Sequence, residues 1–216
     1  MGLQYLILDL DNTLYPKSSG MLQSIDARID EFIAQTTVLA PEQIPGIRHD
    51  YFKRYGTTVG GMVINHGVDP DEYFRYAYDV RIKQFIKPDP ELRQVLAGID
   101  LTKVVFSNSP LEYVENVLRF LGVREIITAV YDIRFCNYLG KPDPQSYRKV
   151  LADLGAAGAE CVFVDDVEAN LYGAAAVGIT PVLLGAARDS AHIWQLEQIY
   201  GLKTLIPEIL KARRSA

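Results

Sequence analysis

The chain has 216 residues, of which 49% are hydrophobic and 23% charged, as in ordinary folded proteins with a substantial core. Its formal net charge of −5 argues against a surface built to bind nucleic acid or an anionic membrane. No run of residues is apolar for long enough to span a bilayer, and residues 1–4 lack the charged start of a secretory signal, so we expect neither a membrane segment nor export.

The two cysteines, Cys136 and Cys161, lack the spacing of a metal site. Because we expect no export signal, both are predicted to be free thiols in a reducing environment. The expected location is therefore cytoplasmic.

Short apolar runs alternate with stretches of helix length along most of the chain. Runs typical of buried strands occupy residues 5–8, 104–106, 126–130, 161–164 and 181–184. Amphipathic stretches cover residues 111–121, 146–154 and 168–177, and each is followed by a glycine, which commonly ends a helix. This alternation predicts an α/β fold with a parallel sheet and helices on both faces, in which ligands bind at the carboxyl ends of the strands.

Residues 17–90 interrupt this alternation. Residues 21–39 and 70–85 are typical of helices, and no buried parallel strand is apparent between them. A glycine-rich connector covers residues 55–61, and the Lys-Pro-Asp-Pro sequence at 87–90 marks a boundary or hinge. We therefore expect a helical insert over residues 17–90 and an α/β core made of residues 1–16 and 91–216. The basic residues 211–214 are expected to follow a last helix and receive no function.

The first expected strand ends in two carboxylates, Asp9 and Asp11. A buried strand cannot readily solvate charge, so acids at its end indicate a site at the edge of the sheet. Residues two apart in an extended chain point to the same side and can meet one ligand. A plain turn at Asp11-Asn12 is the alternative, because such a short motif is only a hypothesis until its context agrees.

The second expected strand is followed by Ser107 and Asn108. Ser109, Pro110 and Glu112 have the spacing of an N-cap, a first-turn proline and a capping-box acid. Ser107 and Asn108 would then precede a helix N-terminus, where unpaired amides favour an anion. The alternative is that both are turn residues only.

Lys141 lies between Gly140 and Pro142 at the start of another expected helix. Prolines fix the backbone here, so the lysine could face a phosphate or neutralise clustered carboxylates. A solvated lysine in a loop is the alternative.

Two adjacent acids, Asp165 and Asp166, follow the fourth expected strand. Neighbouring carboxylates repel each other unless they share a cation, and oxygen-rich sites suit Mg²⁺. Helix capping by Asp166 is the alternative, although it leaves Asp165 unexplained. With the three preceding motifs, this pair describes a magnesium-assisted site for phosphoryl transfer, with a nucleophile, an anion cradle, a cation and metal ligands.

The four motifs, in this order, resemble those of the haloacid dehalogenase superfamily: Asp9-Leu-Asp11-Asn12-Thr13, Ser107-Asn108, Lys141 and Asp165-Asp166. The resemblance covers essentially the whole chain and implies a Rossmann-like parallel-sheet core with a helical C1-type cap inserted after the first strand, over residues 17–90. Within the superfamily the chain looks most like the pyrimidine 5′-nucleotidase group, on residues 9–16, 55–61 and 136–144.

The resemblance implies that Asp9 attacks phosphorus and forms an aspartyl-phosphate. Asp11 would protonate the leaving alkoxide and then activate water. Mg²⁺ would be held by Asp9, the backbone carbonyl of Asp11 and the acids Asp165 and Asp166, with Asp166 as a direct ligand and Asp165 bound directly or through water.

The resemblance also implies that Ser107, the amide of Asn108 and Lys141 hold the phosphoryl oxygens, and that Lys141 steadies Asp9. Substrate choice is expected to come from the cap, whose closure would exclude water. The candidate substrate-binding residues there or near the hinge are Thr57 and Thr58, followed by Tyr15, Lys53 and His66.

The expected activity is Mg²⁺-dependent hydrolysis of a small phosphomonoester, in particular a pyrimidine nucleoside 5′-monophosphate. Phosphoglycolate phosphatase, sugar-phosphate phosphatase and phosphomutase are alternatives within the same superfamily. Dehalogenation of 2-haloacids needs neither magnesium nor an acid at Asp11, and a phosphate-sensing scaffold would not need the catalytic residues, so both are disfavoured. The expected partner is a small phosphorylated metabolite; neither a nucleic-acid polymer nor a membrane is expected.

Overall fold

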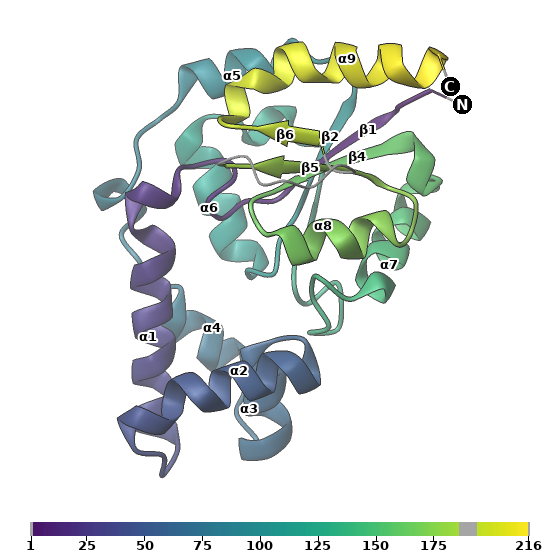
Figure 1. Cartoon of the computed structure of the whole chain (residues 1–216). Helices are drawn as coiled ribbons and strands as arrows, with labels where there is room; N and C mark the ends of the chain where they lie inside the picture. Colours follow the sequence, from purple (N-terminus) through teal and green to yellow (C-terminus); the bar gives the residue numbers. More distant parts are fainter. Residues whose placement is uncertain (1, 186–193, 216) are drawn as a thin grey trace.

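The computed structural model describes residues 2–185 and 194–215. A six-stranded parallel sheet forms its centre, with the strand order β3-β2-β1-β4-β5-β6 (Figure 1). The strands are β1 (Tyr5–Leu8), β2 (Thr102–Phe106), β3 (Ala129–Tyr131), β4 (Cys161–Asp165), β5 (Thr180–Leu184) and β6 (Trp194–Leu196). The predicted α/β fold is therefore confirmed. The edge strand β6 was not predicted, because three half-buried residues carry too short an apolar pattern.

Helices cover both faces of the sheet, as the sequence predicted. The helices packed on it are α5 (Pro90–Ala97), α6 (Leu111–Leu121), α7 (Pro144–Leu154), α8 (Glu168–Ala175) and α9 (Leu202–Ser215). Successive residues of a strand point to opposite faces. In β1, the side chains of Leu6 and Leu8 belong to a hydrophobic cluster that includes residues of α5, α6 and α9. The side chain of Ile7, on the opposite face, belongs to a second hydrophobic cluster, which includes residues of α7 and α8. The central strands β1 and β4 thus read as continuous apolar runs because both of their faces are buried.

Four helices lie between β1 and β2 in the sequence and apart from the sheet in space (Figure 1). They are α1 (Met21–Thr36), α2 (Ile44–Tyr55), α3 (Thr58–His66) and α4 (Pro70–Ala77), called here the α1–α4 segment. Two of its predicted helices were too long. The first ends at Thr36, where the hydroxyls of Thr36 and Thr37 bond to carbonyls of the last turn, and Thr37 is extended. The second ends at Ala77, after which Val80 and Ile82 turn inward to pack against the core.

The predicted connector over residues 55–61 is mostly helical, which corrects the sequence interpretation. Only Gly56, with a φ of 79°, and Thr57 separate α2 from α3. Gly61 lies against Tyr51, and a Cβ added there would come within 2.1 Å of the Tyr51 ring. The glycines therefore permit two helices to approach closely and do not mark a loop.

Two smaller expectations at the ends of elements were also wrong. The third strand, β3, covers Ala129–Tyr131, where residues 126–130 were predicted, because residue 126 closes a 3₁₀ turn over Arg124–Ile126 and the strand starts only at Ala129. The basic residues 211–214 lie within α9 instead of following it. None of the helices in the described ranges combines the length and the hydropathy needed to cross a bilayer.

Candidate active site

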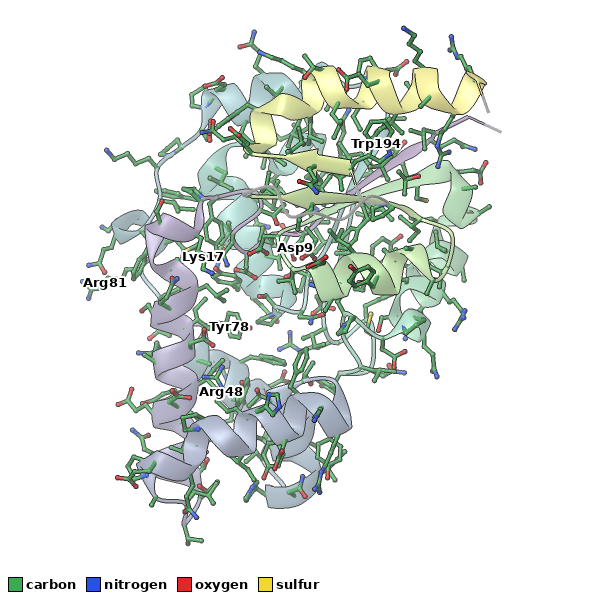
Figure 2. The ribbon with its side chains drawn as sticks, viewed as in Figure 1. Asp9, Lys17, Arg48, Tyr78, Arg81 and Trp194 are labelled. Atoms are coloured by element: carbon green, nitrogen blue, oxygen red, sulfur yellow. The ribbon has the colours of Figure 1, made fainter. Side chains whose placement is uncertain are left out.

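The predicted chemical groups meet at the carboxyl ends of three neighbouring strands. Asp9 follows β1, Ser107 follows β2, and Asp165 is the last residue of β4. Leu8 of β1 is in register with Val105 of β2 and with Val164 of β4, so the residues that follow them lie at one edge of the sheet. Figure 2 labels Asp9 at this place. The strand order therefore brings together residues that are up to 156 positions apart in the sequence.

Lys141 connects two of these acids. Its Nζ donates to Asp9 Oδ1 at 2.5 Å and to Asp165 Oδ2 at 2.8 Å, and its side chain is 2% exposed. Burial alone would lower the pKa of Lys141, but the charges of Asp165 and Asp9 and the hydrogen bonds to them outweigh burial and raise it above its ordinary value. Lys141 is a buried ammonium ion between two carboxylates and not a solvated lysine.

Asn108 holds the backbone of Lys141. Its Oδ1 accepts from the Lys141 amide at 2.8 Å, and its Nδ2 donates to the Lys141 carbonyl at 2.9 Å. A Cβ at Gly140 would lie 2.3 Å from Asn108 Oδ1, so this pairing requires a glycine there. The sequence analysis proposed the backbone amide of Asn108 as a hydrogen-bond donor to an anion and missed the pairing of its side chain with the backbone of Lys141. The residue that could have indicated this close approach is Gly140, immediately before the lysine.

Three carboxylates form a group with the geometry of a metal site. Asp9, Asp165 and Asp166 each offer an oxygen, and these oxygens all lie within 4.8 Å of one another. The donors are oxygen only, which is the set that Mg²⁺ prefers. The three residues present therefore fit a divalent cation, and their role as metal ligands stays a prediction.

The electrostatics of this acid group favour an added cation. Burial raises the pKa of Asp9 well above its ordinary value, and the charges of Asp165 and Asp11 add to this, against the opposing charge of Lys141. Burial and the charge of Asp165 likewise raise the pKa of Asp166 to about 6. One lysine is therefore too little positive charge for these carboxylates, and a divalent ion would supply the remainder.

Asp165 and Asp166 differ in how their oxygens are used. Asp165 Oδ1 accepts from the amide of Val167 at 2.7 Å, and both of its oxygens accept from Asn170 Nδ2 at 3.0 Å, in addition to the Lys141 bond. Asp166 Oδ2 accepts a bond of 3.4 Å from Asn12 Nδ2. Asp166 thus retains more capacity to bind a ligand than Asp165 does.

Asp11 lies outside the acid group and is held by three hydroxyls. Its Oδ1 accepts from Tyr15 at 2.5 Å and from Tyr113 at 2.9 Å, and its Oδ2 accepts from Ser109 at 2.6 Å. The two carboxylates of the first motif therefore have different surroundings: an ammonium ion contacts Asp9, whereas three neutral hydroxyls contact Asp11. Tyr113 was missed by the sequence analysis, because nothing in the local pattern separates it from an ordinary core aromatic.

The helix start predicted at Ser109 was wrong. Pro110 occupies the N-cap position of α6, and Asp132 Oδ2 accepts from the amide of Leu111 at 3.0 Å. Ser109 bonds to Asp11 instead, and Glu112 pairs with Arg134 at 2.9 Å instead of closing a capping box. An acid from a later loop has taken the capping role, which no local pattern could have indicated.

The remaining predicted residues divide into two groups. Ser107 is buried at the carboxyl end of β2, and its Oγ accepts from the amide of Ser109 at 3.1 Å. Thr57 donates to the carbonyl of Tyr138 at 2.9 Å and accepts from the amide of Gly60 at 3.1 Å, so its hydroxyl caps α3 and contacts the loop before Lys141. Thr58 borders a surface cavity of the α1–α4 segment. The structure does not bring Thr57 or Thr58 into contact with the carboxylates, and their substrate-binding role stays a prediction.

Of the other candidates near the expected cap, one reaches the site. Tyr15 contacts Asp11, as described above. Lys53 is exposed on α2. His66 Nε2 shares a hydrogen bond of 2.6 Å with the hydroxyl of Tyr51 inside the α1–α4 segment.

A model of the family described as haloacid dehalogenase-like hydrolase matches residues 3–178 of this chain. Among curated proteins, the chain is 24% identical over 193 residues to Phosphate metabolism protein 8 of Saccharomyces cerevisiae, which covers 81% of this chain and 59% of the yeast protein. It is also 32% identical over 94 residues to Flavin mononucleotide hydrolase 1 of Arabidopsis thaliana, covering 41% of this chain and 36% of the plant protein. The chain thus spans less than two thirds of the length of either relative.

Solved structures with little sequence identity share the fold. The β-phosphoglucomutase of Clostridium difficile superimposes with a TM-score of 0.67 at 14% identity, covering 99% of this chain and 100% of that protein. Identity at this level supports the arrangement of strands and helices and leaves the reaction to be argued from the site.

Proposed function

Because this chain belongs to the haloacid dehalogenase-like hydrolase family, we propose that it hydrolyses small phosphomonoesters with Mg²⁺ through an aspartyl-phosphate on Asp9. The observation that carries this proposal is the separation of two neighbouring carboxylates into two environments. Asp9 lies 2.5 Å from the ammonium group of Lys141, and Asp11 is surrounded by hydroxyls. Such a pair suits a nucleophile and a separate group that transfers protons.

In the first step, Asp9 attacks phosphorus and the bond from phosphorus to the leaving oxygen breaks. Lys141 bonds to Oδ1 of Asp9, so the proposed attacking atom is Oδ2. Asp11 gives its proton to the departing alkoxide, which leaves as an alcohol. Lys141, the amide of Asn108 and Ser107 are the proposed donors to the phosphoryl oxygens.

In the second step, water hydrolyses the aspartyl-phosphate. Asp11, now a carboxylate, takes a proton from the attacking water, and inorganic phosphate leaves Asp9 in its original form. The carboxyl group of Asp11 must therefore act as an acid and then as a base. It can do so because it lies outside the group formed by Asp9, Asp165 and Asp166.

The residues proposed to hold Mg²⁺ are Asp9, the backbone carbonyl of Asp11, Asp166 and Asp165. The hydrogen bonds to both oxygens of Asp165 favour Asp166 as the direct ligand, with Asp165 bound directly or through water. When bound, the cation would supply positive charge against the transferring phosphoryl group.

We expect magnesium binding to weaken below about pH 6, because Asp166, whose pKa burial raises to about 6, then carries a proton that the metal must displace. One displaced proton predicts a dissociation constant that rises by about tenfold for each pH unit below that value. Titration calorimetry of the wild type at about pH 7.5 and about pH 5 measures this. Asp166→Asn should bind weakly at both values, and an equal wild-type affinity at the two would contradict the assignment.

The α1–α4 segment is proposed to act as a C1-type cap domain over residues 17–90, on a core of residues 1–16 and 91–216. Contacts between α4 and the core support this. Arg134 pairs with Asp71 of α4 at 2.6 Å and with Glu112 of α6 at 2.9 Å, while Phe74 of α4 stacks on Tyr138 with ring centroids 6.4 Å apart. Together with the bond from Thr57 to Tyr138, these contacts join the segment to the loop before Lys141.

The proposed substrate is a nucleotide, in particular a pyrimidine nucleoside 5′-monophosphate, and Thr57 and Thr58 are proposed to influence its selection from the cap. The resemblance to pyrimidine 5′-nucleotidases in residues 9–16, 55–61 and 136–144 supports this choice. The name of the plant relative states that it hydrolyses flavin mononucleotide, which is also a phosphomonoester of a molecule that carries a flat ring system. Both cysteines are buried free thiols, in keeping with the cytoplasmic location that we propose.

Phosphate release measured with Mg²⁺ tests the function directly. The panel is UMP, CMP, AMP, IMP, flavin mononucleotide, phosphoglycolate and several sugar phosphates, each with an EDTA control. A preference for UMP and CMP is expected. A flat profile, or one that favours sugar phosphates, would retain the mechanism and remove the nucleotidase assignment, and no release from any ester would contradict the proposed activity.

A further inference from the structure

Three hydroxyls from separate parts of the chain converge on the carboxylate of Asp11. Tyr15 comes from the turn after β1, Ser109 from the loop after β2 and Tyr113 from the first turn of α6. They donate to Asp11 at 2.5, 2.6 and 2.9 Å respectively, and we call them the hydroxyl cluster. Ser109 and Tyr113 lie 98 and 102 residues from Asp11 in the sequence, so the fold has to assemble this cluster.

The hydroxyl cluster is buried and closely packed. Tyr15, Ser109 and Tyr113 are 2%, 3% and 4% exposed. The two tyrosine hydroxyls lie 3.0 Å apart, and Tyr78 at the end of α4 packs edge-on against Tyr113, with ring centroids 5.0 Å apart. Burial, followed by the charge of Asp11, raises the pKa of both Tyr15 and Tyr113, so both remain protonated donors.

The bonds are distributed unequally between the two carboxylate oxygens. A carboxylate offers about four acceptor positions, two on each oxygen. The two tyrosines take both positions on Oδ1, whereas among the described residues Oδ2 accepts from Ser109 alone. One acceptor position on Oδ2 therefore remains.

We propose that Tyr15, Ser109 and Tyr113 are positioning residues that orient Asp11 and leave Oδ2 as the oxygen that exchanges the catalytic proton. This inference rests on the proposed function and says how the carboxyl group of Asp11 is oriented for its acid and base steps. Oδ2 gives its proton to the leaving alkoxide while the bond from Asp9 to phosphorus forms. It then takes one proton from the water that hydrolyses the aspartyl-phosphate, which restores the starting state.

The positioning role predicts a dependence on the leaving group. An alkoxide needs a proton when it departs, whereas p-nitrophenolate departs without one, so loss of acid catalysis should affect only alkyl esters. The parameter to compare is kcat/KM, which covers the steps up to departure of the leaving group and not the later hydrolysis. Tyr113→Phe and Tyr15→Phe each remove one donor and keep the buried ring.

Each variant is expected to lower kcat/KM for glycerol phosphate by on the order of tenfold, as for loss of a hydrogen bond to a charged group. For p-nitrophenyl phosphate the change should be less than about threefold, since no proton is needed. Tyr131→Phe is the matched control, because Tyr131 is a buried tyrosine whose hydroxyl donates to Asp153 at 2.9 Å. It should leave both values unchanged.

A second comparison separates positioning from packing. In an Asp11→Asn background the cluster has no proton-transferring group to orient, so Tyr113→Phe should change kcat/KM for glycerol phosphate by less than about twofold. Thermal melting of every variant, with Mg²⁺ present, shows that the fold is retained, and Tyr15→Phe serves the test if Tyr113→Phe fails to fold.

The possible results distinguish this inference from the proposed function. If the wild type releases phosphate neither from these two esters nor from any ester of the substrate panel, the proposed function fails and the inference with it. If the wild type hydrolyses both esters but the tyrosine variants lower kcat/KM by the same factor for both, the function stands and the inference is overturned. The same holds if Tyr113→Phe lowers kcat/KM for glycerol phosphate by the same factor in the Asp11→Asn background as in the wild type.

Discussion

Replacing Asp9 with asparagine is expected to lower the rate of phosphate release by at least about 10⁴-fold, as for loss of a catalytic nucleophile. The amide of asparagine is neutral and cannot form the aspartyl-phosphate. Its oxygen can still accept the hydrogen bond that Lys141 donates to Asp9 Oδ1 at 2.5 Å, so the local structure should persist. Phosphate release from the preferred ester, with Mg²⁺ in excess, measures the loss.

The same variant should be at least as stable as the wild type when Mg²⁺ is absent. Burial and the neighbouring acids raise the pKa of Asp9, which means that its negative charge is unfavourable in the folded state. Removing that charge relieves this cost, a common relation between active-site acids and stability. Thermal melting in EDTA tests it, and a fall in melting temperature would show that Asp9 is needed for folding.

Asp132→Asn is a matched control for the loss of a buried carboxylate. Asp132 is 7% exposed and accepts hydrogen bonds from the amides of Leu111 and Phe135 away from the acid group. Its replacement should cost stability and leave turnover within about threefold. A variant of Asp9 that keeps more than about 1% of the activity would contradict the assignment of the nucleophile.

Replacing Lys141 with methionine should cost about 3–5 kcal/mol of unfolding free energy, because it removes one partner from a buried group of charges. Methionine has a similar length, but it leaves Asp9 and Asp165 without the ammonium ion that lies 2.5 and 2.8 Å from their oxygens. For a chain of this size, the melting temperature should fall by roughly 10 °C. Phosphate release should fall by about 10³-fold, because a donor to the phosphoryl group is lost as well.

This loss of stability should depend on pH and on magnesium. Without Lys141 the pKa of Asp9, already raised by burial, should rise further. A carboxyl whose pKa is raised in the folded state binds more protons there than in the unfolded chain, so the free energy of unfolding increases as the pH falls. The deficit of Lys141→Met should therefore be smaller at about pH 5 than at about pH 8. Added Mg²⁺ should recover part of it by binding the folded state.

Lys149→Met is the control for loss of a lysine charge outside the site. Lys149 is exposed and lies with its Nζ 4.9 Å from the ring centre of Phe135. Its replacement should change stability by less than about 0.5 kcal/mol. If Lys141→Met melts within about 2 °C of the wild type, the account of a buried and required ammonium ion is wrong.

Most strands, the helices α6, α7 and α8, and the acids at the strand ends could be read from the sequence. Buried strands and amphipathic helices carry local periodicities, and the runs before Asp9, Ser107 and Asp165 were apolar enough to reveal β1, β2 and β4. Parallel strands place their carboxyl ends at one edge, so finding the strands also indicated that these residues would meet. One error in the α1–α4 segment, the loop predicted over residues 55–61, arose because Gly61 serves the contact between two helices, where it lies against Tyr51.

The partner of each polar side chain could not be read in the same way. Ser109 has the local pattern of a helix cap, yet Asp132 caps α6 and Ser109 bonds to Asp11. Asn108 has the pattern of a turn, yet its amide group pairs with the backbone of Lys141, which lies 33 residues away. Each hydroxyl or amide can bond to several groups, and the choice depends on which of them packing brings near and how deeply it buries them.

Local periodicity therefore indicated the α/β architecture, since strand and helix patterns depend on residues a few positions apart. Residue types at the strand ends, with the family resemblance, indicated the four chemical motifs. Tertiary structure alone decided that Lys141 lies between Asp9 and Asp165 and that three hydroxyls surround Asp11. The physical reason is that hydrogen-bond partners and pKa shifts depend on distance and burial in the folded protein, and these come from segments about a hundred residues apart.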